Sequence, residues 1–148
     1  EVTATGIRIS SAGIPDWPFV CDFLNAPDLA QAFAVMAAVA GRSVQLTGLS
    51  TLKHKETDRL QALKTELSAA GAMVEITGDS ISVKGRVAVE RINTRHFPAY
   101  DDHRMVMSLS LLSLSGAEVF LEDPQQVTKS FPGFFNVLEG LGFRCTQL

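Results

Sequence analysis

Apolar side chains recur every three to four residues in four stretches of this chain, a spacing that places them on one face of an α-helix. Three of the stretches end at or near a glycine, a residue that commonly terminates helices. The predicted helices cover residues 27–40, 56–70, 102–114 and 131–138. We expect each helix to bury its apolar face against the rest of the fold.

The first two predicted helices have well-defined apolar stripes. In the helix over 27–40 the stripe consists of Leu29, Phe33, Met36 and Ala40. In the helix over 56–70 it consists of Leu60, Leu63 and Leu67. Because the core-facing side of a surface helix is apolar, we predict that these residues are buried.

Short runs between the helices predict β-strands, because they are rich in residues that favour strands and are bounded by turn residues. The runs are 2–9, 19–24, 43–46, 73–76, 80–84, 87–92, 117–121 and 143–146. Gly78 and Asp79 separate two of them and are typical of a hairpin turn. The predicted order is strand, helix, strand, helix, strand, strand, followed by most of the same again.

This order indicates an internal repeat. Residues 40–46 match residues 115–121 in the placement of glycine and apolar positions. Residues 67–71 match residues 138–142 in the same way. The two matches support one structural unit used twice.

The repeat predicts the fold class and its division. We predict an α/β (α+β) fold of repeated βαβαββ units, with parallel and antiparallel strands packed around helices. Residues 17–85 would form one unit, residues 86–148 a second, and residues 1–10 the tail of a preceding repeat. The chain does not begin with methionine, and we expect residues 1–148 to be the C-terminal part of one domain of a longer protein.

Composition and charge narrow the classes of function. The formal net charge of −3 gives no support to a nucleic-acid partner, which usually needs a basic surface. No apolar run reaches membrane-spanning length and no signal peptide is visible, so we predict a cytoplasmic protein. Cys21 and Cys145 fit neither a disulfide framework nor a metal motif. His54, His96 and His103 lack the spacing of metal ligands, so we expect no metal site.

Cations stand at three predicted helix starts, where the helix dipole favours acids. They are Lys55 and Arg59, His103 and Arg104, and Lys129. A helix N-terminus beside a lysine or arginine is a good site for an anion. Alternatively, these are solvated charges offset by nearby acids, namely Glu56, Asp58, Asp101 and Asp102. The charge pattern leaves both interpretations open.

Two carboxylates are candidates for acid–base chemistry. Glu56 stands between Lys55 and Arg59, which share a helix face at a spacing of four, and it can also meet Arg59. That placement suits proton transfer beside an anionic substrate, whereas the alternative is a surface ion pair of little energetic weight. Asp28 stabilises a helix N-terminus, or it binds or deprotonates a hydroxyl. Its position does not separate the two roles.

Four motifs resemble those of the EPSP synthase family, in the right order. They are NAPD at 25–28, KETDRL at 55–60, YDDHRM at 100–105 and VTKSFP at 127–132. The second and third are highly specific, and the resemblance covers nearly the whole chain. It implies the enolpyruvyltransferase fold, with two domains of three βαβαββ units each and with helix N-termini that face the cleft between the domains.

The resemblance also implies an activity and catalytic residues. The family transfers the enolpyruvyl group of phosphoenolpyruvate to the 5-hydroxyl of shikimate 3-phosphate and releases phosphate, without a cofactor or an essential metal. Asp28 matches the candidate base for that hydroxyl, and Lys55 a candidate proton donor or acceptor beside it. Glu56 matches the glutamate implicated in proton transfer at the methylene carbon of phosphoenolpyruvate.

Five residues are implied to bind substrate besides the two that lie near the hydroxyl. Arg59, Arg104 and Lys129 match the cations that hold the carboxylate and phosphate of phosphoenolpyruvate. His103 matches a histidine in the same cluster. Thr51 stands where family members often have asparagine, and we expect its hydroxyl to contact shikimate 3-phosphate.

The same resemblance implies partners and a limit on this chain. The partners are shikimate 3-phosphate, phosphoenolpyruvate and the N-terminal domain of the same enzyme, which contributes further ligands. We therefore expect the chain alone to be inactive and the full-length enzyme to be monomeric. One alternative is the related enolpyruvyltransferase that acts on UDP-N-acetylglucosamine, which the motifs at 55–60 and 100–105 fit poorly. Another is a non-catalytic interaction domain of the same fold, which predicts scattered acids and bases.

Overall fold

The computed structural model describes residues 2–3, 6–7 and 19–147 of the chain. Its central feature is a four-stranded sheet with the strand order β3-β4-β6-β5. The strands are β3 (Phe19–Asp22), β4 (Val44–Thr47), β5 (Met73–Thr77) and β6 (Ser80–Lys84). β3 and β4 are parallel, whereas β6 is antiparallel to both of its neighbours. The sheet therefore combines parallel and antiparallel strands, as predicted.

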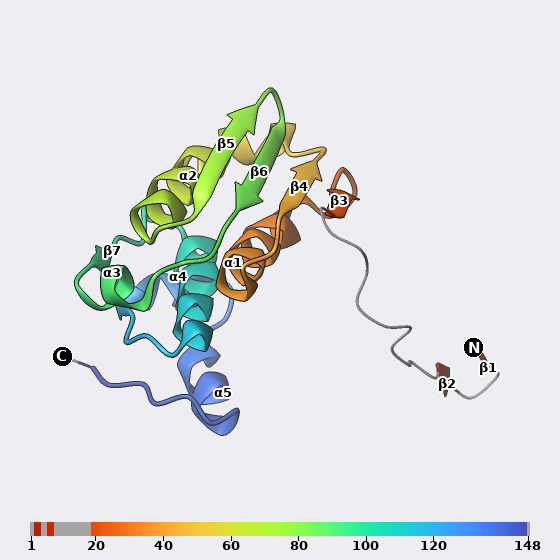
Figure 1. Cartoon of the computed structure of the whole chain (residues 1–148). Helices are drawn as coiled ribbons and strands as arrows, with labels where there is room; N and C mark the ends of the chain where they lie inside the picture. Colours follow the sequence, from red (N-terminus) through yellow and green to blue (C-terminus); the bar gives the residue numbers. More distant parts are fainter. Residues whose placement is uncertain (1, 4–5, 8–18, 148) are drawn as a thin grey trace.

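Two helices connect these strands and pack on one face of the sheet (Figure 1). They are α1 (Ala30–Ala40), preceded by the 3-10 turn η1 (Pro27–Leu29), and α2 (Arg59–Ala69), preceded by η2 (Ser50–His54). Residues 19–84 thus have the order βαβαββ. Because β3 and β4 are parallel, their C-terminal ends lie at the same end of the sheet. These ends lead into η1 and η2. The two turns lie next to each other there.

Gly48 permits a close approach at this end of the sheet. It follows β4 and has a φ of 73°, in the left-handed region that glycine adopts without steric cost. A Cβ atom at this position would lie 2.6 Å from the backbone nitrogen of Leu24. The lack of a side chain therefore lets the segment after β4 pass close to the end of β3.

The rest of the described chain is mostly helical. Its elements are α3 (Val89–Asn93), β7 (His96–Phe97), α4 (His103–Ser110), η3 (Leu111–Ser115), β8 (Phe120–Leu121), η4 (Pro124–Lys129) and α5 (Phe134–Gly140). β7 and β8 form a short parallel pair. α4 packs against α1 on one side and η4 on the other, so it joins this region to the four-stranded sheet (Figure 1).

Four predicted strands differ from the structure, and of these the run 117–121 is a strand only at Phe120–Leu121. The run 87–92 forms α3 instead, because the backbone N–H groups of Val87 and Ala88 bond to carbonyls at the ends of α1 and α2 rather than to a strand. Residues 143–147 contain no strand. Where one strand over 2–9 was predicted, β1 (Val2–Thr3) and β2 (Gly6–Ile7) pair antiparallel, and the other residues of that run lie outside the described part.

The core lies between the sheet and helices α1, α2 and α4. Leu46 and Ile81 of the sheet are fully buried, as are Leu60, Leu63 and Leu67 of α2. The predicted stripe of α2 is therefore confirmed. Among the described residues, no helix combines the length and the apolar character needed to cross a membrane.

α1 buries a different face from the one predicted. Leu29 and Met36 are 61% and 51% exposed, whereas Val35 is fully buried. The prediction that Leu29, Phe33, Met36 and Ala40 face the core is therefore wrong. The physical reason is that this alanine-rich helix is apolar on nearly every side, so that the spacing of its larger residues does not mark the face that packs.

Candidate active site

Helix α2 begins three residues later than the sequence suggested. Its N-cap is Asp58, whose carboxylate accepts a hydrogen bond from the backbone N–H of Gln61 at 3.0 Å. Aspartate is a preferred N-cap residue, and Lys55 and Glu56 consequently lie in the segment between η2 and α2. The prediction that Lys55 and Arg59 share a helix face is therefore wrong.

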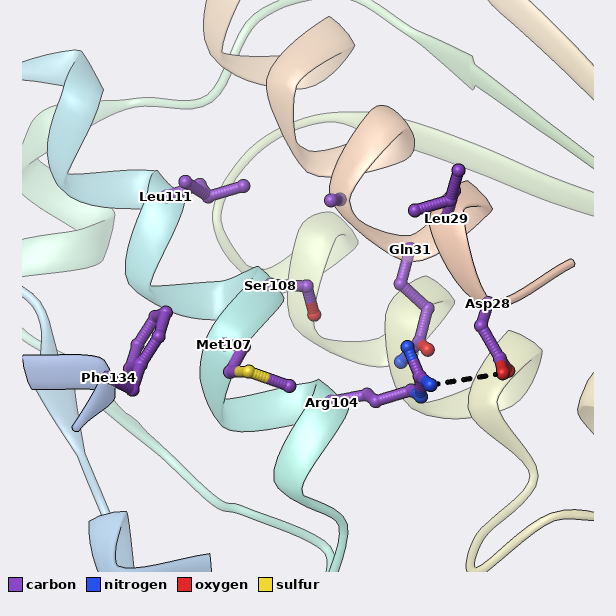
Figure 2. A pocket seen from close by; sticks show the side chains of 9 residues that line it. Asp28, Leu29, Gln31, Arg104, Met107, Ser108, Leu111 and Phe134 are labelled. Atoms are coloured by element: carbon purple, nitrogen blue, oxygen red, sulfur yellow. Dashed lines mark ion pairs between the residues drawn. The ribbon is translucent and has the colours of Figure 1, made fainter. Parts of the chain in front are cut away.

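The two cations nevertheless meet at Asp28. Arg59 Nη1 lies 2.7 Å and Lys55 Nζ 3.9 Å from Asp28 Oδ1. Arg104 approaches the other oxygen, Oδ2, at 3.2 Å (Figure 2). Asp28, on η1, thus receives cations from α2, from the segment before it and from α4. It does more than stabilise a helix N-terminus, since it joins three parts of the chain.

Arg59 is held by a second carboxylate deeper in the fold. Its Nε donates to Asp102 Oδ2 at 2.6 Å and its Nη2 to Asp102 Oδ1 at 3.1 Å. The side chain of Arg59 is 3% exposed and that of Asp102 is fully buried. This two-point geometry matches the planar fork of a guanidinium to a carboxylate. An acid therefore offsets Arg59, but the pair is buried and not solvated as the second interpretation of the cation pattern predicted.

His103, the first residue of α4, pairs with Glu56. The Nδ1 atom of His103 lies 3.3 Å from Glu56 Oε2. Within the part of the chain described, this Nδ1 atom has no partner with hydrogen-bond geometry. Glu56 does not pair with Arg59, so that predicted contact is wrong. The Glu56 side chain is 38% exposed and that of His103 only 11%. The carboxylate is thus accessible, with a buried imidazole behind it.

A possible metal site at this pair does not fit its surroundings. Glu56, Asp102 and His103 place one ligand atom each within 4.8 Å of one another. Both oxygens of Asp102, however, already accept hydrogen bonds from Arg59. A cation bound there would meet the positive charge of that guanidinium. The donor set favours an ion-pair network over metal ligation.

Lys129 lies at the end of η4 and reaches the N-terminal side of α4. Its ammonium donates to the backbone carbonyl of Asp101 at 2.8 Å. Gln126, also on η4, donates to the side chain of Asp101 at 3.3 Å. Because Asp101 directly precedes the N-cap of α4, Lys129 joins the same part of the molecule as His103.

A cavity of about 250 Å³ opens beside Asp28 and Arg104. Its lining residues are Asp28, Leu29, Gln31, Ala32, Arg104, Met107, Ser108, Leu111 and Phe134. Figure 2 shows the Asp28–Arg104 ion pair at one end of this lining, with Leu111 and Phe134 away from it. The cavity therefore has a charged end formed by two predicted site residues and an apolar remainder.

Comparisons with known proteins identify the family of the chain. The family model for EPSP synthase (3-phosphoshikimate 1-carboxyvinyltransferase) matches residues 2–138. The chain belongs to the EPSP synthase family. Among solved structures, an EPSP synthase from Acinetobacter baumannii matches with a TM-score of 0.68 and 28% identity, over 78% of this chain and 27% of that one. The chain thus has the enolpyruvyltransferase fold expected from its motifs.

Curated EPSP synthases show how much of the family's length is present. A 3-phosphoshikimate 1-carboxyvinyltransferase of Bacteroides fragilis is 38% identical over 143 residues, which are 97% of this chain and 35% of the relative. One from Cellvibrio japonicus is 38% identical over 132 residues, 88% of this chain and 30% of the relative. The chain therefore spans about a third of the length of the EPSP synthases that it matches.

One predicted residue stands apart, and two others were missed. Thr51 is exposed on η2, and its hydroxyl makes no hydrogen bond to the charged cluster within the described residues. Asp102 was considered only as an offsetting acid, although an aspartate directly before a predicted helix is an N-cap signal. Gln31 was missed: its Nε2 donates to Met105 Sδ at 3.2 Å, and its buried Oε1 has no partner among the residues described. A lone glutamine in an alanine-rich helix was the available signal.

Neither cysteine is among the residues that meet at Asp28 or line the cavity. Cys21 and Cys145 are both free thiols. Burial, followed by the nearby charge of Glu139, raises the pKa of the Cys145 thiol. The thiol therefore stays protonated at neutral pH, and the protonated form is a poor nucleophile.

Proposed function

We propose that this chain is the C-terminal part of one domain of an EPSP synthase. The whole enzyme then transfers the enolpyruvyl group of phosphoenolpyruvate to the 5-hydroxyl of shikimate 3-phosphate and releases phosphate. Residues 17–85 correspond to one βαβαββ unit, whereas residues 86–148 supply part of a second, because their described residues contain only the strands β7 and β8. The observation that carries the proposal is the meeting of Lys55, Arg59 and Arg104 at Asp28, because residues far apart in sequence form one charged site.

Asp28 and Lys55 act on the acceptor hydroxyl. The carboxylate of Asp28 accepts the proton of the 5-hydroxyl while the hydroxyl oxygen bonds to C2 of phosphoenolpyruvate. The Asp28 side chain is 31% exposed and that of Lys55 37%, so both can reach a bound substrate. Their separation of 3.9 Å allows the ammonium to stabilise the carboxylate before the proton moves, and to donate to the hydroxyl oxygen.

Glu56 serves the methylene carbon of phosphoenolpyruvate. In the addition step this carbon gains a proton, and in the elimination step it loses one while the C2–O bond to phosphate breaks. A single carboxyl group can supply and then remove that proton. His103 lies 3.3 Å from the Glu56 carboxylate, on the buried side of it.

Three cations stabilise the charge of the donor. Arg104 is 36% exposed and Lys129 is exposed, so they can hold carboxylate and phosphate groups directly. Arg59 uses three of its five N–H donors on Asp102 and Asp28. One N–H on each terminal nitrogen remains for a ligand carboxylate. Fixed cations in a closed cleft stabilise the charge that develops in the tetrahedral intermediate.

The test is turnover by the full-length enzyme that contains this chain. With phosphoenolpyruvate and shikimate 3-phosphate, we expect release of one phosphate per enolpyruvyl group transferred. With UDP-N-acetylglucosamine as acceptor, we expect none. Asp28→Asn should lower kcat by at least about 100-fold, because it removes the base but keeps the shape of the side chain. Turnover with the UDP-sugar alone, or full activity in Asp28→Asn, would contradict the proposal.

A further inference from the structure

Two left-handed residues precede the charged end of α4. Tyr100 and Asp101 have φ values of 58° and 55°. This conformation is uncommon for residues other than glycine, and it persists where surrounding contacts hold it. Asp102, His103 and Arg104 follow directly. The direction in which these three side chains point therefore depends on whatever holds the turn.

The turn is held by Glu66, a buried carboxylate that the proposed chemistry does not use. The side chain of Glu66 is 1% exposed. The Tyr100 hydroxyl donates to Glu66 Oε1 at 2.5 Å, and Arg95 donates to Oε2 at 2.9 Å from Nε. Burial, and then the hydrogen bond to Glu66, raises the pKa of Tyr100. The hydroxyl thus stays a donor throughout the neutral range.

One helix holds the turn at both ends. Glu66 follows Arg59 by seven residues, which is two helical turns, so both side chains project from the same face of α2 about 10 Å apart along its axis. Arg59 bonds to Asp102, and Glu66 bonds to Tyr100. Tyr100 is thus attached at the start of the left-handed pair, and Asp102 is attached directly after it. Loss of either attachment would free one side of the turn.

The turn also orients Arg104 and Lys129, the cations proposed to bind phosphoenolpyruvate. The Asp101 carbonyl accepts the hydrogen bond from Lys129, and the Asp102 carboxylate accepts one from the backbone N–H of Arg104 at 2.8 Å. On the acceptor side, the ion pair of Lys55 goes to Asp28 and not to the turn. Asp28 lies on η1 and, within the described part of the chain, is linked to the turn only indirectly, through Arg59 and Arg104. A loosened turn should therefore disturb the donor side more than the acceptor side.

We propose that Glu66 is a positioning residue for the donor substrate, acting through Tyr100 and Arg95 on the turn before α4. This inference rests on the proposed function, because the donor is taken to be phosphoenolpyruvate. It concerns a residue that touches neither substrate. Glu66 contributes by keeping Arg104 and Lys129 in the orientation that binds the donor anion.

The experiment compares two substitutions in the full-length enzyme, Glu66→Gln and Tyr100→Phe. Each removes part of the attachment and nearly preserves the shape. We expect the KM for phosphoenolpyruvate to rise about tenfold in both, since small misplacements of binding groups have large effects. The KM for shikimate 3-phosphate should stay within about twofold of the wild type. Unchanged KM values for phosphoenolpyruvate in both variants would overturn the proposal.

Leu67→Ala is the control for a purely structural effect. Leu67 adjoins Glu66 on α2 and is fully buried, so the substitution destabilises the core without removing a bond to the turn. We expect a lower unfolding midpoint with both KM values unchanged. If Leu67→Ala raises the KM for phosphoenolpyruvate as Glu66→Gln does, the effect is loss of stability and the proposal is wrong.

A second measurement does not depend on turnover. In Tyr100→Phe and Glu66→Gln, backbone amide exchange of a peptide spanning residues 99–106 should quicken about tenfold, while a peptide spanning 73–84 should not change. If the wild-type enzyme shows no turnover, the proposed function fails. The exchange result then decides alone: a faster rate in 99–106 supports a turn held by Glu66, and an unchanged rate overturns it.

Discussion

Arg59 joins two carboxylates that come from different parts of the chain. Asp102 is fully buried, whereas the Asp28 side chain is 31% exposed. A buried ion pair contributes little net stability when compared with apolar residues, but removal of one partner leaves an uncompensated buried charge. Asp102 therefore matters for the fold as well as for the orientation of Arg59. Asp28 is the half-buried partner that a substrate hydroxyl can reach.

We predict that Asp102→Ala lowers the free energy of unfolding by about 3 kcal/mol, because it leaves Arg59 buried with only one carboxylate. Asp58→Ala is the matched control, since Asp58 also caps a helix but is exposed. It should cost about 1 kcal/mol, the usual loss for an N-cap. Urea unfolding of the chain measures both. Equal losses in the two variants would show that Asp102 acts only as a cap.

At the scale of elements, α1 and α2 differ in how their sequences relate to packing. α2 carries Leu60, Leu63 and Leu67 at helical spacing, so periodicity alone identifies its buried side, on which Arg59 and Glu66 are buried as well. α1 has small apolar residues nearly all round, and contacts with β4, β6, α4 and η3 decide which side is covered. The bulky residues Leu29 and Met36 remain exposed as a result.

The two faces of α1 predict opposite results for neighbouring residues. Val35 is fully buried and Met36 is 51% exposed. Val35→Ala should lower the free energy of unfolding of the chain by about 2 kcal/mol, because it removes two buried methyl groups and leaves a cavity. Met36→Ala should change it by less than about 0.5 kcal/mol. Thermal or urea unfolding of the two variants checks this prediction. A larger loss of stability in Met36→Ala than in Val35→Ala would mean that α1 packs through the face expected from the spacing.

At the scale of the whole molecule, several of the proposed site residues lie on the surface of the chain. Asp28, Glu56, Arg104 and Lys129 are all partly or fully exposed, and the cavity beside Asp28 is bounded by residues of η1, α1, α4 and α5. The chain spans about a third of the length of its relatives. Under the proposed function, the groups that close the site would come from the part of a full-length EPSP synthase that this chain does not span.

We therefore expect the 148-residue chain alone to release no phosphate from phosphoenolpyruvate and shikimate 3-phosphate. Exposed cations in water bind anions weakly, because solvent and salt screen their charge. Ligand titration by calorimetry should accordingly show much weaker binding than in the full-length enzyme, which serves as the positive control. Phosphate release by the isolated chain above the rate of an enzyme-free blank would contradict this expectation.

The sequence by itself determined those features that depend on residues close together along the chain. The stripe of Leu60, Leu63 and Leu67 and the strands of the four-stranded sheet follow local patterns, which is why they agree with the structure. The motif at 55–60 identified the family, because six specific residues in a row are a stronger signal than a periodic spacing of apolar residues. Of the cations at predicted helix starts, Lys55, Arg59 and Arg104 meet at Asp28 in the structure.

Only the tertiary structure decided which of these residues meet. Asp28, Arg59 and Arg104 lie far apart in sequence, so their contacts depend on how η1, α2 and α4 pack. Glu56 pairs with His103 rather than with Arg59 because α2 begins at Arg59 and leaves Glu56 outside the helix. Local propensity indicates where a helix can form, whereas burial of surface and pairing of charges determine its neighbours.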